Sequence, residues 1–251
     1  MTTRLSNKQL LLSKLETTYN TNPTLNGPQA ILASNLSFAP NAGSAIPRDR
    51  AYPNFGKSQQ GMETPYSTLS MDVDMAGSGA AGTAPLYGPL LRACGFSETI
   101  TASTSVEYSS ISGSFESIYQ RFNWDGVAQD LGGCRGKVSL KIEANKEPAW
   151  TFAFSGLYHP PADISFITGI PTTLNAWIDP VTVSLANTTF SLFGVNSALS
   201  SLSIDWGQKV TFSDKPNRAG IDMTDRVVTA TAVVEAASVA SIDWDTKVAT
   251  K

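Results

Sequence analysis

Two aspartates, Asp72 and Asp74, have the type and spacing that most suggest a site of chemistry. An Asp-x-Asp pair followed by glycines, here Gly77 to Gly82, superficially matches a calcium loop or a pair of catalytic acids. A calcium loop also needs oxygen ligands at further alternate positions and a bidentate glutamate, whereas here Val73 and Met75 alternate with the aspartates. We therefore favour a solvent-facing strand surface and expect no metal or cofactor, with a metal site as the alternative.

Nucleophilic catalysis needs a base that a third group orients, and the only histidine of the chain is His159. Asp163 lies close to it in sequence, but the chain contains no G-x-S-x-G nucleophile elbow. We interpret His159 as structural and expect no enzyme activity. The alternative is a hydrolase that uses Asp72, Asp74 and His159.

The elements that must position the aspartates form one unit. Leu69 to Met75 alternates between apolar and polar residues, which predicts a strand with Asp72 and Asp74 on its solvent side. The following GSGAAG matches a G-x-G-x-x-G phosphate cradle, but no parallel-sheet pattern accompanies it, so we interpret it as a flexible connector. Residues 85–95 then predict a short helix that docks on the sheet through apolar side chains, namely Leu86, Leu90, Leu91 and Cys94.

Composition limits the class of protein. The chain has 251 residues, of which 16% are charged, a formal net charge of −3, and no run of lysines or arginines, which disfavours a surface that coats nucleic acid. Its two cysteines fit no metal spacing, and no stretch of eighteen apolar residues occurs. We expect one soluble, unexported, mainly β domain over residues 1–251, with no membrane partner.

Short β-branched runs bounded by turn residues predict an antiparallel meander. Asp125-Gly126 predicts a hairpin turn, and Gly132-Gly133 predicts a second chain reversal. Ser6 to Tyr19 has a weakly helical pattern that leaves a helix open, and Thr21 to Pro28 is typical of an extended arm. Strands are expected at Ala30–Pro40, Ser114–Asn123, Val127–Leu131, Lys137–Ala144, Trp150–Tyr158, Val181–Ala186, Thr189–Phe193, Ser200–Trp206, Lys209–Ser213 and Val227–Val234.

The loop at residues 51–65 carries Tyr52, Phe55 and Met62 among prolines, glycines and polar residues. Apolar side chains on a long loop favour a contact surface, and the alternative is an Ω-loop folded on itself. The five tryptophans could form a sugar-binding platform, but tryptophans in strands are more often core or interface residues.

Several blocks in a fixed order resemble the tail tube proteins of long-tailed bacteriophages. The resemblance covers most of the chain and contains no catalytic motif. Its blocks are LSNKQLLLSKLETTYNTNPT (5–24), AILASNLSFAP (30–40), MDVDMAGSGAAGTAPLYGPLLRACGF (71–96), WDGVAQDLGGCRGKVSLKIEANKEPAWTFAFSGLYHPP (124–161) and TDRVVTATAVVE (224–235).

The resemblance implies a fold and an assembly. The fold would be two packed antiparallel sheets, a β-sandwich or partial barrel, flanked by a short helix. Homohexameric rings would join their inner sheets into a β-barrel and stack into the tube of the virion tail, after assembly in the host cytoplasm. DNA would pass through the lumen without specific binding.

The resemblance also implies roles for particular segments. Asp72 and Asp74 become candidates for the lumen, and the 1–28 arm and the 51–65 loop, with Tyr52, Phe55 and Met62, become candidates for contacts between rings. Residues 236–251 are a C-terminal extension. By analogy the partners are further copies of the chain, a tape measure protein, and tail terminator and distal tail proteins. A β-sandwich module that binds carbohydrate or a host surface is the alternative function.

Overall fold

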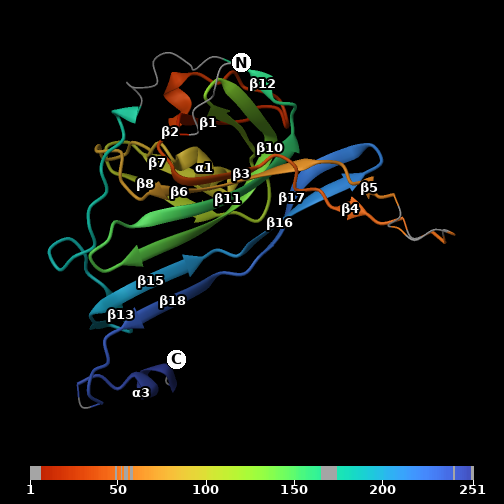
Figure 1. The fold of residues 1–251 in the computed structure, drawn as a ribbon. Coiled ribbons are helices and arrows are strands. Elements are labelled where there is room, and N and C mark those ends of the chain that lie inside the picture. Colours follow the sequence, from red (N-terminus) through yellow and green to blue (C-terminus); the bar gives the residue numbers. More distant parts are fainter. Residues whose placement is uncertain are drawn as a thin grey trace.

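The computed structural model is mainly β and antiparallel, as predicted, and describes residues 7–48, 50, 51, 53, 56, 59–164, 174–239 and 241–249 (Figure 1). Over these residues the main sheet consists of ten strands: β1 (Gln9–Leu15), β2 (Ala30–Ile31), β3 (Ser34–Ala39), β6 (Tyr66–Asp74), β9 (Ile118–Trp124), β10 (Val127–Glu143), β11 (Ala149–Tyr158), β12 (Ala162–Asp163), β15 (Leu199–Asp205) and β18 (Thr229–Val234).

Smaller elements surround the main sheet. The two-stranded sheets of the described residues are β4 (Ala45–Ile46) with β5 (Gly61–Met62), β7 (Phe96–Thr101) with β8 (Ser105–Ser110), β13 (Ser191–Leu192) with β14 (Val195–Asn196), and β16 (Gln208–Lys215) with β17 (Arg218–Arg226). The helical elements are a 3-10 turn, η1 (Gly27–Gln29), and two short helices, α1 (Gly88–Ala93) and α3 (Trp244–Ala249).

Strand β10 has 17 residues and pairs with different strands along its length. Its first part pairs with β9, and its last part pairs with β11 on one side and with β15 on the other. The predicted hairpin at Asp125-Gly126 joins β9 to β10. The chain reversal expected at Gly132-Gly133 is wrong, because these glycines form a bulge within β10 where both registers shift. Gly133 has a φ of +59°, and the Tyr19 ring fills the space that a side chain would need.

The main sheet bends so that β3, at one end of it, faces β9. Phe38 on β3 and Phe122 on β9 lie with ring centroids 5.7 Å apart, although several strands separate them in the sheet. Instead of two separate packed sheets, one bent sheet encloses the core, and it does not close into a barrel. The main core cluster joins Leu11, Leu69, Met71, Val73, Phe152, Phe154, Ile118, Leu131 and Val138 with residues of α1.

The strand that carries the two aspartates follows the predicted alternation. Every second residue of β6 is buried, including Leu69, Met71 and Val73, so Asp72 and Asp74 point to the opposite side. Met75, expected to continue the buried face, lies beyond the end of the strand and is 36% exposed.

Helix α1 is shorter than the predicted helix at 85–95. The backbone N–H of Gly88 bonds to the carbonyl of Pro85, so the preceding residues form a turn, and Pro89 occupies the first turn of the helix. Leu90, Leu91 and Cys94 are buried in the main cluster, whereas Leu86 precedes the helix and is 37% exposed. The helix therefore docks through a narrower apolar stripe than the sequence suggested.

The backbone conformation of the connector between β6 and α1 requires glycine most strictly at residue 82. Gly82 has a φ of +69°, and a Cβ atom there would lie 2.3 Å from the backbone nitrogen of Ser103. We expect Gly82→Ala to lower the free energy of unfolding by about 2 kcal/mol or more, because a strained φ and a backbone clash add together. Gly77→Ala is the matched control, since a Cβ atom at that position would meet no other atom within 4 Å. Chemical denaturation of both variants tests this, and equal losses would contradict it.

The N-terminal helix considered for Ser6 to Tyr19 is wrong, since residues 9–15 form β1 between β2 and β9. Leu11 packs into the main core cluster, while Leu10 and Leu12 pack with Leu25 and Tyr119 in a second cluster. A strand covered on both faces has a continuous apolar run, which resembles one side of a helix. Residues 9–15 therefore belong to the body of the molecule and not to an arm.

The last third of the chain matches the predicted strands only in part. Strands β15, β16 and β18 lie where Ser200–Trp206, Lys209–Ser213 and Val227–Val234 were expected. Val181–Ala186 contains no strand, only Ser191 and Leu192 of the expected Thr189–Phe193 are in β13, and β17 was not predicted. The single predicted strand at Ala30–Pro40 is divided into β2 and β3.

Candidate functional site: a polar sheet face and its open edge

A polar face extends across β3, β6, β11, β10, β15 and β18, on the side of the sheet away from the main core cluster. The register aligns its side chains in cross-strand rows. One row consists of Ser34, Asp72, Thr151, Ser139, Asp205 and Thr229, and the next consists of Asp74, Ala149, Lys141, Ser203 and Thr231. We call this surface the polar face.

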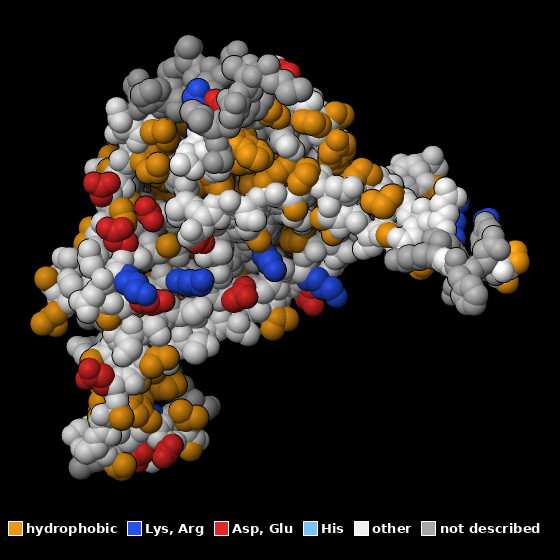
Figure 2. All heavy atoms as spheres, viewed as in Figure 1, with side chains coloured by type: hydrophobic (Ala, Val, Ile, Leu, Met, Phe, Trp, Pro, Cys, Tyr) orange, Lys and Arg blue, Asp and Glu red, His pale blue; other side chains and the backbone are white. Residues whose placement is uncertain are grey.

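Short side chains and opposite charges characterise the polar face. Most of its side chains are Ser, Thr or Ala, and the acidic Asp72, Asp74 and Asp205 are interspersed with the basic Lys137 and Lys141. Figure 2 shows acidic and basic side chains next to one another over the middle of the molecule. A surface with this composition has no large field of one sign.

The two predicted aspartates lie on this face but differ in their surroundings. The Nδ2 group of Asn35, on β3, donates a hydrogen bond of 2.8 Å to Oδ2 of Asp72. The Asp72 carboxylate thus has a partner, while the Asp74 carboxylate has no hydrogen-bond partner among the described residues. The described part of the chain contains no group of three His, Cys, Asp or Glu side chains that could hold a metal.

Strand β18 forms an open edge of the sheet. Among the described residues β18 pairs with β15 alone, and its sequence from Thr229 to Val234 contains no charge and no proline. At the other end β3 is interrupted by a bulge, where Asn35 has a φ of +50°. Bulges, charges and prolines protect edge strands from pairing with other chains, so β18 is the less protected of these two edges.

Apolar side chains are exposed near the open edge. Val233 is 51% exposed, and Val227 and Val228, which lead into β18, are 64% and 53% exposed. On the side opposite the polar face, Ala230 and Ala232 are also exposed. An uncharged edge with apolar neighbours is a surface suited to strand addition from another chain.

The expected contact loop lies partly outside the described residues, which include neither Tyr52 nor Phe55. Met62 is on β5 opposite Ala45 and is 63% exposed. Figure 1 shows β4 and β5 at the opposite end of the molecule from α3. This end is attached to the β16–β17 hairpin, because the Tyr66 and Phe212 rings stack at 4.9 Å and Thr64 Oγ1 donates to Asp214 Oδ2.

Sequence reasoning missed the residues that anchor the β16–β17 hairpin to the sheet. The backbone N–H of Ile221 donates to the Tyr19 hydroxyl at 2.8 Å, and Arg135 donates to the Ile221 carbonyl at 2.7 Å. The buried Gln208 side chain accepts from the Val138 N–H and donates to the Cys94 carbonyl. These residues are widely separated in sequence and form no motif, so no local signal could have identified them.

His159 and the two cysteines lie among residues that hold or bury them within the fold. His159 Nε2 lies 2.9 Å from Asn20 Oδ1, and its ring contacts that of Tyr119. Cys94 and Cys134 are free and buried, and burial raises the pKa of each thiol well above its usual value.

The tryptophans do not form a common platform. Trp150 and Trp206 pack against each other, Trp206 also packs against Phe96, and both adjoin the main core cluster, as does Trp177. Trp124 lies at the end of β9, and Trp244 lies on α3. The tryptophans therefore do not provide a shared aromatic surface on which a sugar ring could stack.

The helices of the described residues are too short or too polar to cross a membrane. No protein-family model matches this chain, and no curated protein proved similar to it.

Proposed function

We propose that this chain is the structural subunit of a bacteriophage tail tube, in which stacked hexameric rings form the conduit for DNA. The observation that carries the proposal is a polar face of short side chains that ends at the unprotected strand β18. A monomer gains nothing from such an edge, which invites aggregation, whereas a ring of subunits uses it.

Ring formation follows from the two ends of the sheet. Strand β18 of one copy pairs with β3 of the next, and six such heterologous contacts close a ring. The polar faces of the copies then form one continuous inner surface. The bulge at Asn35 limits the stretch of β3 that is available for pairing and so helps to define the register.

The polar face has the chemistry of a surface along which DNA slides. Carboxylates such as Asp72, Asp74 and Asp205 repel phosphates, and the interspersed lysines prevent a strong field of either sign. Ser and Thr side chains keep the surface wet and smooth.

The projecting elements supply contacts between rings. The end that carries Met62 on β5 projects from one side, and the described residues from 235 onward leave the sheet directly after β18. Residues 9–15 are part of the sheet, and Tyr19 and Leu25 pack against it, so the described part of the 1–28 segment belongs to the body of the molecule and does not form an arm. The tape measure, terminator and distal tail proteins would contact these surfaces and the lumen.

Negative-stain electron microscopy of the purified protein tests the proposal. Rings or hollow tubes of uniform diameter are the expected result. Persistent monomers at high concentration would contradict it, and glycan binding by such monomers would favour the carbohydrate-binding alternative.

The charge of the polar face gives a separate prediction for the phage. Asp72→Lys with Asp74→Lys replaces two negative charges by two positive ones and raises the net charge of each copy by four, so DNA phosphates should adhere to the wall. We expect normal tubes but at least about tenfold slower genome ejection, measured by DNA release from purified particles. Glu107→Lys with Glu147→Lys, at exposed sites off the polar face, is the matched control. Unchanged ejection by the Asp72 and Asp74 variant would refute the proposed role of these charges.

A further inference from the structure

The C-terminal segment carries a formed helix away from the sheet, and we use this name for the described residues from 235 to 249. Figure 1 shows α3 beyond β18, on the side of that strand opposite to β15. Asp243 caps the helix, because its carboxylate accepts hydrogen bonds from the backbone N–H and from Oγ1 of Thr246. None of the residues of α3 is buried. A helix of six residues is marginal in water unless it packs on another surface, so this helix needs a surface outside the segment.

The nearest hollow of the same copy does not provide that surface. The segment starts where the backbone N–H of Glu235 bonds to the carbonyl of Ala198. A hollow of about 250 Å³ opens there beside Leu185, and no residue of the described C-terminal segment lines it. Val239 and Val248, within the segment, are 74% and 64% exposed. The segment therefore carries exposed apolar side chains beyond the open edge of the sheet and leaves the hollow of its own copy open.

The topology of the sheet fixes which end of the next copy the C-terminal segment meets. From β18 through β15, β10, β11 and β6 to β3, each of the five pairings is antiparallel, so β18 and β3 run in opposite directions. In the proposed ring, β18 of one copy lies beside β3 of the next, and both sheets have the same orientation. The end of β18 at Val234 therefore meets the start of β3 at Ser34, and not its end at Ala39.

An apolar hollow lies at this end of the next copy. Ser34 pairs with Asp72 near the end of β6, and the connector to α1 follows directly. The hollow has a volume of about 190 Å³, and Leu86, Trp177 and Ile178 line it together with the connector. Leu86 and Ile178 are 37% and 44% exposed. Since neighbouring strands are about 4.8 Å apart, the end of β6 lies only about 10 Å beyond β18 across the interface, within reach of the residues that join β18 to α3.

We propose that the C-terminal segment of one copy docks on this hollow of the next copy, with Val248 of α3 packed against Leu86 and Ile178. Burial of exposed aliphatic side chains from both copies stabilises the contact, and the packing supplies what so short a helix lacks. The contact joins neighbours within one ring, beside the contacts between rings proposed above. The inference rests on the proposed function for the ring in which β18 and β3 are neighbours, but the pairing of these strands does not by itself require it.

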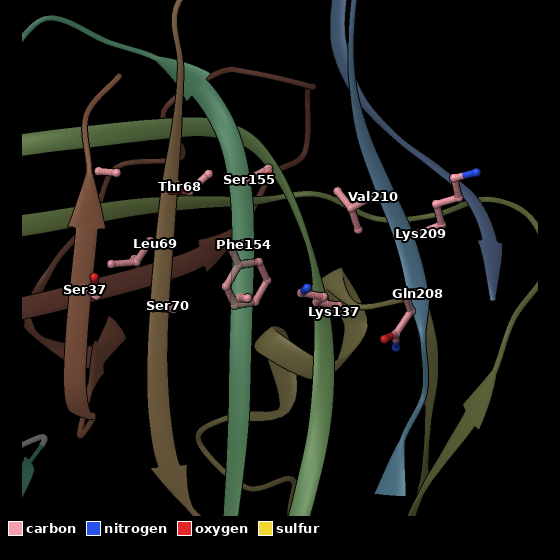
Figure 3. A pocket seen from close by; sticks show the side chains of 12 residues that line it. Ser37, Thr68, Leu69, Ser70, Lys137, Phe154, Ser155, Gln208, Lys209 and Val210 are labelled. Carbon is pink, nitrogen blue, oxygen red and sulfur yellow. The ribbon is translucent and has the colours of Figure 1, made fainter. Parts of the chain in front are cut away.

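A second hollow, at the other end of β3, provides the control. It has a volume of about 510 Å³ and lies beside β16, where Figure 3 shows Ser37 on β3. If β18 and β3 ran in the same direction across the interface, the C-terminal segment would meet this end instead. Ser37 is exposed and belongs to the same edge strand, so a cysteine there is a matched control for a cysteine at Ile178.

Cross-linking between differently tagged copies of the full chain tests the proposal. Val248→Cys protein is mixed under assembly conditions with Ile178→Cys protein or with Ser37→Cys protein, and a short bismaleimide is added. The native Cys94 and Cys134 are buried, so wild type should remain unlinked. We expect a mixed dimer with Ile178→Cys and at least about tenfold less product with Ser37→Cys, because docking raises the effective concentration of only the first pair of thiols.

Assembly of charged variants provides a second measurement. Val248→Asp and Ile178→Asp should each raise the protein concentration required for assembly about tenfold, and the double variant should raise it no further, because both changes remove the same contact. Leu185→Asp, in the hollow of the same copy, is the control and should assemble as wild type does.

Three results would each overturn the proposal: no mixed product with Ile178→Cys, equal product with Ile178→Cys and Ser37→Cys, or normal assembly of both Val248→Asp and Ile178→Asp. Electron microscopy of the same samples separates this inference from the proposed function. Rings without the mixed product count against this inference alone, whereas absence of rings counts against the proposed function.

Discussion

We expect a proline in β18 to prevent the proposed assembly without unfolding the chain, provided that it replaces a residue whose N–H points away from β15. Successive N–H groups of an antiparallel strand point to opposite sides, so Thr231 and Ala232 direct theirs differently. One of the two substitutions, Thr231→Pro or Ala232→Pro, removes a ladder bond to β15, and the other removes only a donor of the open edge.

The two proline variants thus serve as controls for each other. For the outward-facing position we expect an unchanged melting temperature and an association constant at least about tenfold lower, which corresponds to about 1.4 kcal/mol per interface. For the other position we expect a lower melting temperature. Thermal unfolding and sedimentation velocity, measured on the same preparations, distinguish the two effects. If both variants form tubes as readily as wild type, β18 is not an assembly edge.

Phe152→Ala is the substitution expected to destabilise the isolated subunit most. The ring is fully buried, stacks on Phe154 with centroids 5.9 Å apart, and lies between Met71 and Val138 in the sheet register. Deleting a buried aromatic ring removes its contacts and leaves a cavity, which costs about 3–5 kcal/mol.

The adjacent residue provides the control for this effect. Ala153 points to the polar face, so Ala153→Ser adds a hydroxyl to a surface already rich in hydroxyls. We expect it to change the free energy of unfolding by less than about 0.5 kcal/mol, as measured by denaturant titration. Similar losses for both variants would mean that the two sides of β11 are not divided into core and surface.

Features set by neighbouring residues were predicted well. Alternation alone placed Leu69, Met71 and Val73 inside β6 and the two aspartates outside, and Asp125-Gly126 identified its hairpin. These signals depend on residues a few positions apart. The strand-rich, antiparallel class followed from them.

Features set by distant residues were not predictable. The run Leu10 to Leu12 was ambiguous because only the fold shows that β1 is covered on both faces. Strand β17 has a polar sequence in which Ile221 is fully buried, and its position depends on Tyr19 and Arg135, far away in the chain. The candidate site was found in part for the same reason: the sequence identified Asp72 and Asp74, but Lys137, Lys141 and Asp205 joined them only through the sheet register.

The way β18 is attached determines how the subunit would respond to mechanical force. Strand β18 joins the body of the sheet through β15, and β15 pairs with β10 only over residues 139–143, whereas β6 pairs with β11 along its full length. A pull perpendicular to these strands separates the ladder one hydrogen bond at a time, while a pull along them loads all the bonds together. A tube held by β18 contacts would therefore resist sliding between neighbouring subunits better than sideways separation, and the first ladder to open would lie inside the subunit, between β10 and β15.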